Sequence, residues 1–104
     1  MQSVTPKEAH DGLAQEQGAI LLDVRTPEEV RAMSIAGALA IPLGELGGRT
    51  SELAGYTKVF VFCLSGGRSA RATRLLSESG VPAVNIAGGI TAWKAAGLPT
   101  ESAA

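Results

Sequence analysis

Short apolar runs alternate with polar segments along most of the chain. Three mainly apolar runs are four to six residues long and are bounded by turn-forming residues: 19–24, 59–62 and 83–86. Runs of this length are typical of strands that are buried on both faces of a parallel sheet. A further brief strand is expected just before Pro42, because proline lacks the N–H group that a strand ladder requires.

The segments between these strands carry signals for helices. Thr5-Pro6-Lys7-Glu8 and Thr26-Pro27-Glu28-Glu29 both have the form of a capping box with proline at the first helical position. The pattern predicts helices over 6 to about 18, 27 to about 33, 68–79 and 90–96. In the glycine-rich stretch 43–55, only short helical turns around 45–46 and 51–53 are expected. The tail 101–104 is expected to be frayed.

This alternation of strands and helices predicts an α/β fold with three layers, in which helices cover both faces of a mainly parallel sheet of about five strands. The 104 residues suffice for one hydrophobic core, so we expect a single domain over 1–104 with its core at about 4–99. Ligands of such sheets bind outside the carboxyl ends of the strands. Asp23, Arg25 and Cys63 all lie at predicted strand ends, and we expect them to share one edge of the sheet.

Charge and cysteine content exclude several kinds of partner. The formal net charge is −1, and the chain has one cysteine and one histidine. We therefore expect no binding to nucleic acid or to a membrane surface, and no metal site. A single cysteine forms no internal disulfide, and an exposed Cys63 thiol suits a reducing compartment. No signal-peptide pattern or stretch of transmembrane length is present, so the expected location is the cytoplasm.

Cys63 stands where an apolar strand ends and a short loop leads into a helix. The loop and the first helical residues are Leu64, Ser65, Gly66, Gly67, Arg68 and Ser69. The backbone N–H groups of such a loop and the positive end of the helix stabilise a thiolate, and this predicts a nucleophilic cysteine. Arg68 is expected to close the loop and contact an oxyanion or a terminal sulfur. Ser65 and Ser69 are candidate donors to a bound sulfur, and Ser69 is equally a candidate helix cap.

Four blocks of sequence resemble, in order and spacing, the rhodanese domain over nearly the whole chain. They are Leu21-Leu22-Asp23-Val24-Arg25-Thr26-Pro27-Glu28-Glu29, Ile35-Ala36-Gly37-Ala38 with Ile41-Pro42-Leu43, Cys63-Leu64-Ser65-Gly66-Gly67-Arg68-Ser69-Ala70, and Gly88-Gly89-Ile90-Thr91-Ala92-Trp93 before Gly97-Leu98-Pro99. The resemblance implies a sulfurtransferase in which Cys63 takes a sulfane sulfur from thiosulfate or a persulfide and becomes a persulfide. The sulfur then passes to a thiol or cyanide. Donor and acceptor are small molecules, with a protein donor or acceptor as a further option, and no cofactor is implied.

Two other functions remain as alternatives. Four residues separate Cys63 from Arg68, one fewer than in cysteine phosphatases, whose wider loop holds a phosphate. A cysteine phosphatase or an arsenate reductase is therefore the less favoured enzyme. Rhodanese-fold domains also occur as non-catalytic interaction or regulatory modules, but such members commonly lose the cysteine that this chain retains.

The chain also departs from the family pattern. Met33-Ser34 stand where many relatives have Gly-His. Leu64 and Ser65 follow the cysteine where thiosulfate-specific members carry basic residues, so thiosulfate is expected to be a poor or surrogate donor. Asp23 and Arg25 either form a structural pair at the sheet edge or contact the substrate, and we favour the structural pair.

Overall fold

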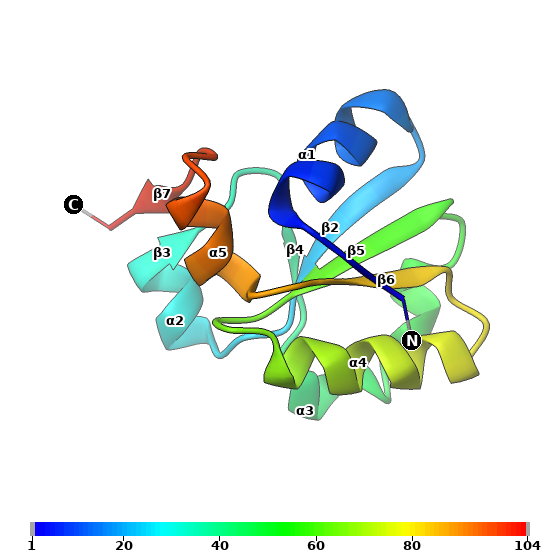
Figure 1. Ribbon diagram of the computed structural model, residues 1–104. Coiled ribbons are helices and arrows are strands. Elements are labelled where there is room, and N and C mark those ends of the chain that lie inside the picture. The colour runs from blue at the N-terminus through cyan, green and yellow to red at the C-terminus, as the bar shows by residue number, and fades with distance from the viewer. Residues whose placement is uncertain (1, 104) are drawn as a thin grey trace.

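Five parallel strands form the central sheet (Figure 1). The computed structural model describes residues 2–103. The strands are β1 (Ser3–Val4), β2 (Ala19–Asp23), β4 (Leu39–Ala40), β5 (Lys58–Phe62) and β6 (Ala83–Ile86). They lie in the order β1-β6-β5-β2-β4, and each neighbouring pair is parallel. The predicted α/β class with a five-stranded, mainly parallel sheet is confirmed.

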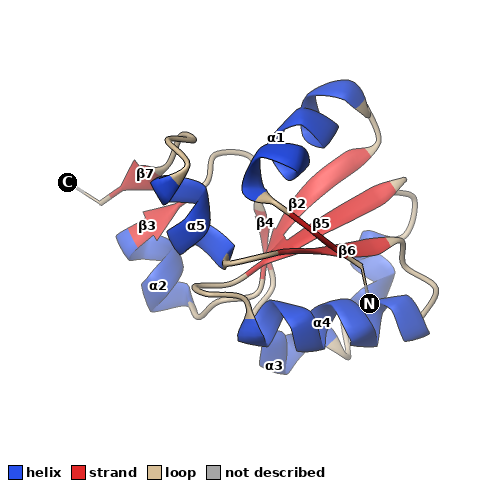
Figure 2. Ribbon diagram, in the orientation of Figure 1, coloured by secondary structure: helices blue, strands red, loops and turns tan. Residues whose placement is uncertain are grey.

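Helices cover both faces of this sheet (Figure 2). They are α1 (Pro6–Gln15), α2 (Pro27–Ala32), α3 (Leu43–Leu46), α4 (Gly67–Glu78) and α5 (Gly89–Ala95), with a 3-10 turn η1 (Thr50–Leu53). Both predicted capping boxes form: the Thr5 and Thr26 hydroxyls accept from the N–H groups of Glu8 and Glu29, whose side chains accept from the threonine N–H groups. These bonds satisfy donors that the first turn of a helix leaves unpaired, and they start α1 and α2 at the expected residues.

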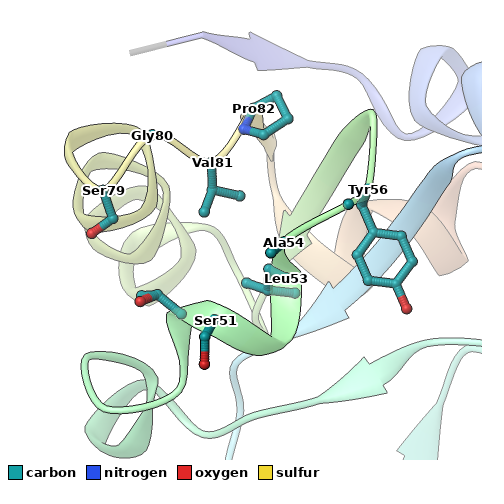
Figure 3. A pocket seen from close by; sticks show the side chains of 10 residues that line it. Ser51, Leu53, Ala54, Tyr56, Ser79, Gly80, Val81 and Pro82 are labelled. Atoms are coloured by element: carbon teal, nitrogen blue, oxygen red, sulfur yellow. The ribbon is translucent and has the colours of Figure 1, made fainter.

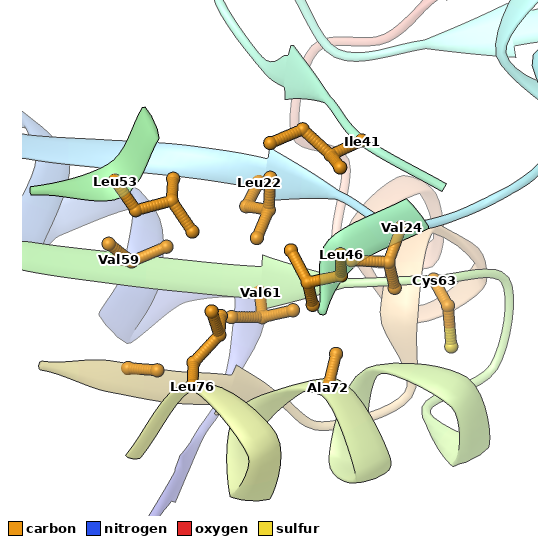
Figure 4. Close-up of a cluster of buried hydrophobic side chains, with 11 residues drawn as sticks. Leu22, Val24, Ile41, Leu46, Leu53, Val59, Val61, Cys63, Ala72 and Leu76 are labelled. Carbon is orange, nitrogen blue, oxygen red and sulfur yellow. The ribbon is translucent and has the colours of Figure 1, made fainter. Parts of the chain in front are cut away.

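Alternating side chains of β5 divide the core into two layers. Val59 and Val61 pack on the side of α3, α4 and η1 (Figure 4). Phe60 and Phe62 belong to the opposite layer, together with Trp93 of α5. Each such buried side chain contributes about 1.5–3 kcal/mol of transfer free energy. A slip of one residue along β5 would exchange the two layers, so packing specifies the register that delivers Cys63 to the strand end.

Two short pairings involve segments that the hydrophobic pattern does not mark. Strand β1 adds to the sheet beside β6. Strands β3 (Met33–Ser34) and β7 (Glu101–Ser102) form a separate antiparallel pair, and the N–H of Ala103 donates to the carbonyl of Ala32 at 3.1 Å. The prediction of a frayed tail is therefore wrong up to Ala103, and position 104 lies outside the described residues. Two-residue strands are held by backbone bonds, which no side-chain periodicity reveals.

The two edges of the sheet differ in chemistry. Asp23 of β2 is in register with Phe62 of β5, so Asp23 and Cys63 leave the sheet together at the carboxyl edge, as expected. At the opposite edge, the segments that precede β5 and β6 enclose a pocket of about 430 Å³ (Figure 3). Tyr56 is the only ionisable side chain in its lining. The carboxyl edge is therefore the place where reactive groups meet.

Candidate active site

Cys63 lies directly after β5 and faces α4 (Figure 4). The residue is 1% exposed, so the expectation of an exposed thiol is wrong. Its side chain belongs to the apolar layer between the sheet and α4. The next residue, Leu64, is 47% exposed. The cysteine sulfur is thus buried beneath a loop whose first side chain faces solvent.

Hydrogen bonds converge on the sulfur from the loop and from the start of α4. The Gly66 N–H donates to Cys63 Sγ at 3.1 Å, and the thiol lies 3.4 Å from Ser69 Oγ, to which it donates. Burial raises the pKa of the Cys63 thiol, but the Ser69 hydroxyl and the backbone N–H groups of Ser69, Gly66 and Ser65 outweigh it and hold the pKa below its ordinary value. A thiol in such a setting supplies more thiolate at neutral pH than a free cysteine does.

Ser69 is not the cap of its helix. Helix α4 begins after Gly66, a residue with φ +116° and no capping side chain, which leaves Ser69 inside the first turn. The Ser69 hydroxyl donates to Asn85 Oδ1 of β6 at 2.6 Å, and Asn85 Nδ2 donates to Ser3 Oγ of β1 at 3.5 Å. Ser69 and Asn85 are both buried. A chain of polar groups therefore runs from β1 under the sheet edge to the sulfur.

Sequence reasoning overlooked Asn85. The apolar pattern of Ala83-Val84-Asn85-Ile86 predicts a buried strand, and the Asn85 amide is the only polar side chain in it. Buried polar groups need hydrogen-bond partners, so a lone amide in an apolar strand is a signal for a polar neighbour. The lone amide indicates that a hydrogen-bond partner is required, but it does not identify that partner, which is Ser69 of α4.

The turn before α5 supports the cysteine loop from behind. The N–H groups of Ile90 and Thr91 donate to the carbonyls of Cys63 and Leu64 at 2.9 and 3.1 Å. Gly89 has φ +60°, and a Cβ at this position would lie 2.6 Å from the Leu64 carbonyl oxygen. Only glycine permits this approach. The double glycine of the fourth sequence block thus holds the loop that carries Cys63.

Asp23 and Arg25 form a buried ion pair at the same edge. Arg25 Nε and Nη2 donate to Asp23 Oδ1 and Oδ2 at 2.9 and 2.7 Å, and both residues are nearly inaccessible. Arg25 also donates to the backbone carbonyls of Glu29 and Met33 at 3.3 and 2.6 Å. These contacts join the end of β2 to α2 and to β3, which agrees with the favoured structural pair. The arginine reaches α2 through carbonyls, and not through the Glu28 or Glu29 carboxylate.

Arg68 is bound in a way that differs from the sequence expectation. Its Nη1 and Nη2 donate to Glu29 Oε1 and Oε2 at 2.6 and 2.8 Å, so the guanidinium faces a carboxylate of α2. Glu29 Oε1 also accepts from the N–H and hydroxyl of Thr26 at 3.1 Å. The hydrogen bond from Arg68 is the main cause that lowers the Glu29 pKa from 4.5 to about 2. The same carboxylate therefore caps α2 and binds the arginine of the loop.

A shallow groove lies beside the loop. Its volume is about 460 Å³, and it is lined by Met33, Leu64, Ile90, Thr91, Lys94 and Ala95. Within residues 2–103, no three His, Cys, Asp or Glu side chains are grouped to hold a metal ion. In the same range, no helix is both long enough and apolar enough to cross a membrane.

Known proteins resemble this chain in sequence and in fold. A sulfurtransferase of Allochromatium vinosum is 39% identical over 88 residues, which cover 84% of this chain and 82% of the relative. Thiosulfate sulfurtransferase 16, chloroplastic, of Arabidopsis thaliana is 36% identical over 113 positions, covering 96% and 92%. The crystal structure of a rhodanese-related protein from Thermoplasma volcanium has a TM-score of 0.88 at 33% identity, covering 97% of this chain and 98% of that one.

The family assignment rests on most of the chain. A family model described as a rhodanese-like domain matches residues 5–96, a range that includes the cysteine loop, the Asp23–Arg25 pair and the glycine turn. The relatives bear sulfurtransferase names at moderate identity, and this supports a role in sulfur transfer. The chain belongs to the family of rhodanese-like domains.

Proposed function

We propose that this chain is a sulfurtransferase that carries a sulfane sulfur as a persulfide on Cys63. The observation that carries the proposal is the set of hydrogen bonds at Sγ, which hold the thiol pKa below its ordinary value at the end of β5. The donor is thiosulfate or a persulfide, and the acceptor is a thiol or cyanide. Either partner is a small molecule or a group on another protein.

In the loading step, the Cys63 thiolate attacks the outer sulfur of the donor. With thiosulfate, a bond forms between Sγ and the sulfane sulfur, the S–S bond of the donor breaks, and its electron pair leaves with sulfite. The product is a Cys63 persulfide anion, so both charge and oxidation level are balanced. The N–H groups of Ser65, Gly66 and Ser69, which favour the thiolate, are the local donors for the negative charge of the persulfide.

In the unloading step, an acceptor thiolate attacks the outer sulfur of the Cys63 persulfide. The S–S bond to Sγ breaks, its electron pair returns to Sγ, and the acceptor becomes a persulfide. The Cys63 thiolate is regenerated in the same hydrogen-bonded setting. A persulfide also lengthens the side chain by about 2 Å, the length of an S–S bond, which helps a buried sulfur to meet an acceptor at the loop surface.

The alternative functions have less support. A phosphatase needs a loop that surrounds a phosphate with N–H groups and an arginine, but this loop has four residues between Cys63 and Arg68, and Arg68 is bound by Glu29. A non-catalytic module does not need a thiol with a lowered pKa. We also propose a cytoplasmic location for this chemistry, because the reduced thiol that it requires persists there.

Intact mass spectrometry tests the proposal. The protein is incubated with thiosulfate or with glutathione persulfide, and then with cyanide or a thiol. We expect the wild type to gain the mass of one sulfur atom and to lose it with the acceptor. The Cys63→Ser variant should gain none. If no donor adds sulfur to the wild type, the chain is not a sulfur carrier, and the non-catalytic alternative gains support.

A further inference from the structure

Arg68 is the only cation within the cysteine loop and its helix start, and its charge is already balanced. Both terminal nitrogens bind Glu29, with N–O distances of 2.6 and 2.8 Å. The arginine and glutamate side chains are 35% and 27% exposed, so the pair is partly shielded from solvent. A bidentate pair of this kind is among the stronger hydrogen-bonded contacts in proteins. An incoming anion would have to compete with Glu29 for the guanidinium.

The second cation at this edge is balanced as well. Arg25 is buried against Asp23, with which it shares two hydrogen bonds. Neither arginine therefore offers a free positive charge to a dianion at Cys63. Within the loop, the remaining attraction for negative charge comes from the N–H groups, which are partial charges, and a further cation, Lys94, lies in the adjoining groove. Such a setting suits a reacting sulfur of low charge better than an inorganic dianion.

The groove beside the loop favours a donor with a carbon body. Four of its lining side chains are apolar: Met33, Leu64, Ile90 and Ala95. Leu64 directly follows the nucleophile, and among the described residues it is the large hydrophobic side chain that is exposed. The Thr91 N–H donates to the Leu64 carbonyl and so fixes the loop backbone at this residue. Thiosulfate has no apolar part to cover this surface. Lys94 at the same groove is a counterpart for the carboxylate of a cysteine-derived thiol.

We propose that the site selects an organic persulfide over thiosulfate as its sulfur donor, and that Glu29 sets this selectivity by balancing the charge of Arg68. The inference rests on the proposed sulfur transfer through Cys63 and names the donor class for that step. Glu29 is a positioning residue, because it acts through Arg68 and does not touch the reacting sulfur.

The step with an organic persulfide, R–S–SH, is balanced without a further reactant. The Cys63 thiolate attacks the outer sulfur, and a bond forms between Sγ and that sulfur. The S–S bond of the donor breaks, and its electron pair leaves with R–S⁻. Cys63 then carries S–SH with the proton of the donor. The persulfide group brings no charge to the reacting sulfur, and the charge of the Cys63 thiolate leaves with R–S⁻, whereas thiosulfate brings two further charges into the loop.

Loading rates for two donors test the selectivity. The probes are thiosulfate and glutathione persulfide at equal concentration, with the loaded fraction read by intact mass over time. In the wild type we expect the persulfide to load at least about tenfold faster. Glu29→Gln frees Arg68 and should raise thiosulfate loading about tenfold, an effect of one unbalanced charge that falls as ionic strength rises. Persulfide loading should change much less.

The chain offers a matched control. Glu8 forms the same capping box at α1 that Glu29 forms at α2, so Glu8→Gln removes an equivalent helix-capping charge away from the loop. This variant should leave both loading rates unchanged. In the double variant Glu29→Gln, Arg68→Gln the gain in thiosulfate loading should disappear, because the freed cation is gone. The thermal midpoint of each variant shows that the fold is kept.

Three results would overturn the inference. Equal loading of the wild type by the two donors would contradict the selectivity itself. A donor ratio that is the same in Glu29→Gln, Glu8→Gln and the wild type would contradict the role of Glu29 while leaving sulfur transfer intact. If neither donor loads the wild type, both the selectivity and the proposed function fail.

Discussion

The hydroxyl of Ser69 is the side-chain group that most directly controls the Cys63 thiol. It lies 3.4 Å from Sγ, accepts from the neutral thiol and donates to Asn85 Oδ1 at 2.6 Å. When the thiol ionises, the hydroxyl proton of Ser69 turns from Asn85 to the sulfur, and the thiolate accepts from it. The Ser69→Ala substitution removes the hydroxyl and leaves the helix backbone in place. Burial then raises the pKa of the Cys63 thiol with less opposition, because only the backbone N–H groups still lower it. The pKa must move upward, and the thiolate population at neutral pH must fall.

The contact distances give the size of this effect. A hydrogen bond to a charged group is worth about 1.5–3 kcal/mol, and the loss of the bond to Asn85 Oδ1 when the hydroxyl turns to the thiolate favours the lower end. About 1.5 kcal/mol corresponds to roughly a tenfold loss of thiolate at neutral pH. The substitution also leaves Asn85 Oδ1 buried without its donor, which costs about 1–3 kcal/mol of stability.

Alkylation by iodoacetamide measures the thiolate directly, because Cys63 is the only cysteine in the chain. The rate is followed as a function of pH, and the profile of Ser69→Ala should lie at higher pH, with a roughly tenfold slower rate at pH 7. Ser79→Ala is the control: its hydroxyl bonds to the Leu75 carbonyl at the far end of the same helix. A Ser69→Ala profile that coincides with those of the wild type and Ser79→Ala would refute the hydrogen-bond account.

Three further predictions concern the framework of the site. The pKa of Glu29 is lowered from 4.5 to about 2, so the ionised carboxylate stabilises the fold above pH 4.5, and this stabilisation is lost as the pH falls towards 2. Solvent screening of the side chain, which is 27% exposed, reduces the contribution to about 1–2 kcal/mol, which urea unfolding at a series of pH values measures. Gly89→Ala should destabilise by more than about 2 kcal/mol and disturb the loop, whereas Gly37→Ala, also at positive φ but with free space around it, should cost about 1 kcal/mol. Asp23→Ala leaves Arg25 buried without its carboxylate partner, and the free energy of unfolding, measured by heat or urea, should fall by about 3–5 kcal/mol.

Each of these predictions has a contradicting outcome. A stability profile between pH 5 and pH 2 that is identical in the wild type and Glu29→Gln would remove the ion pair as its cause. Equal losses in the two glycine variants would show that backbone conformation alone, and not the close approach at Gly89, matters. For Asp23→Ala, a loss no larger than that of Glu28→Ala, which breaks only the exposed pair with Arg31, would contradict the structural role of the buried pair.

Local signals account for what the sequence alone determined. The two capping boxes predict the starts of α1 and α2, and the apolar runs predict β2, β5 and β6, because each pattern lies within a few consecutive residues. The same local logic puts Cys63 at a strand end, before glycines and a helix. Fold class, the position of Cys63 and the loop length could therefore be stated from the sequence, and the order of the four blocks identified the family.

The tertiary structure decided which distant groups meet. Glu29 and Arg68 are 39 residues apart, and Ser69 and Asn85 are 16 apart. No periodicity of side chains encodes such pairs, so the sequence left Arg68 free for a substrate and Asn85 as an ordinary strand residue. Burial of the thiol likewise depends on how α4 packs against β5. The sequence by itself thus determined that this protein has an α/β sheet with its single cysteine at a strand end. Only the packing of α2, α4 and β6 around the loop decided which charges and hydrogen bonds that cysteine meets, because those contacts exist only when the chain is folded.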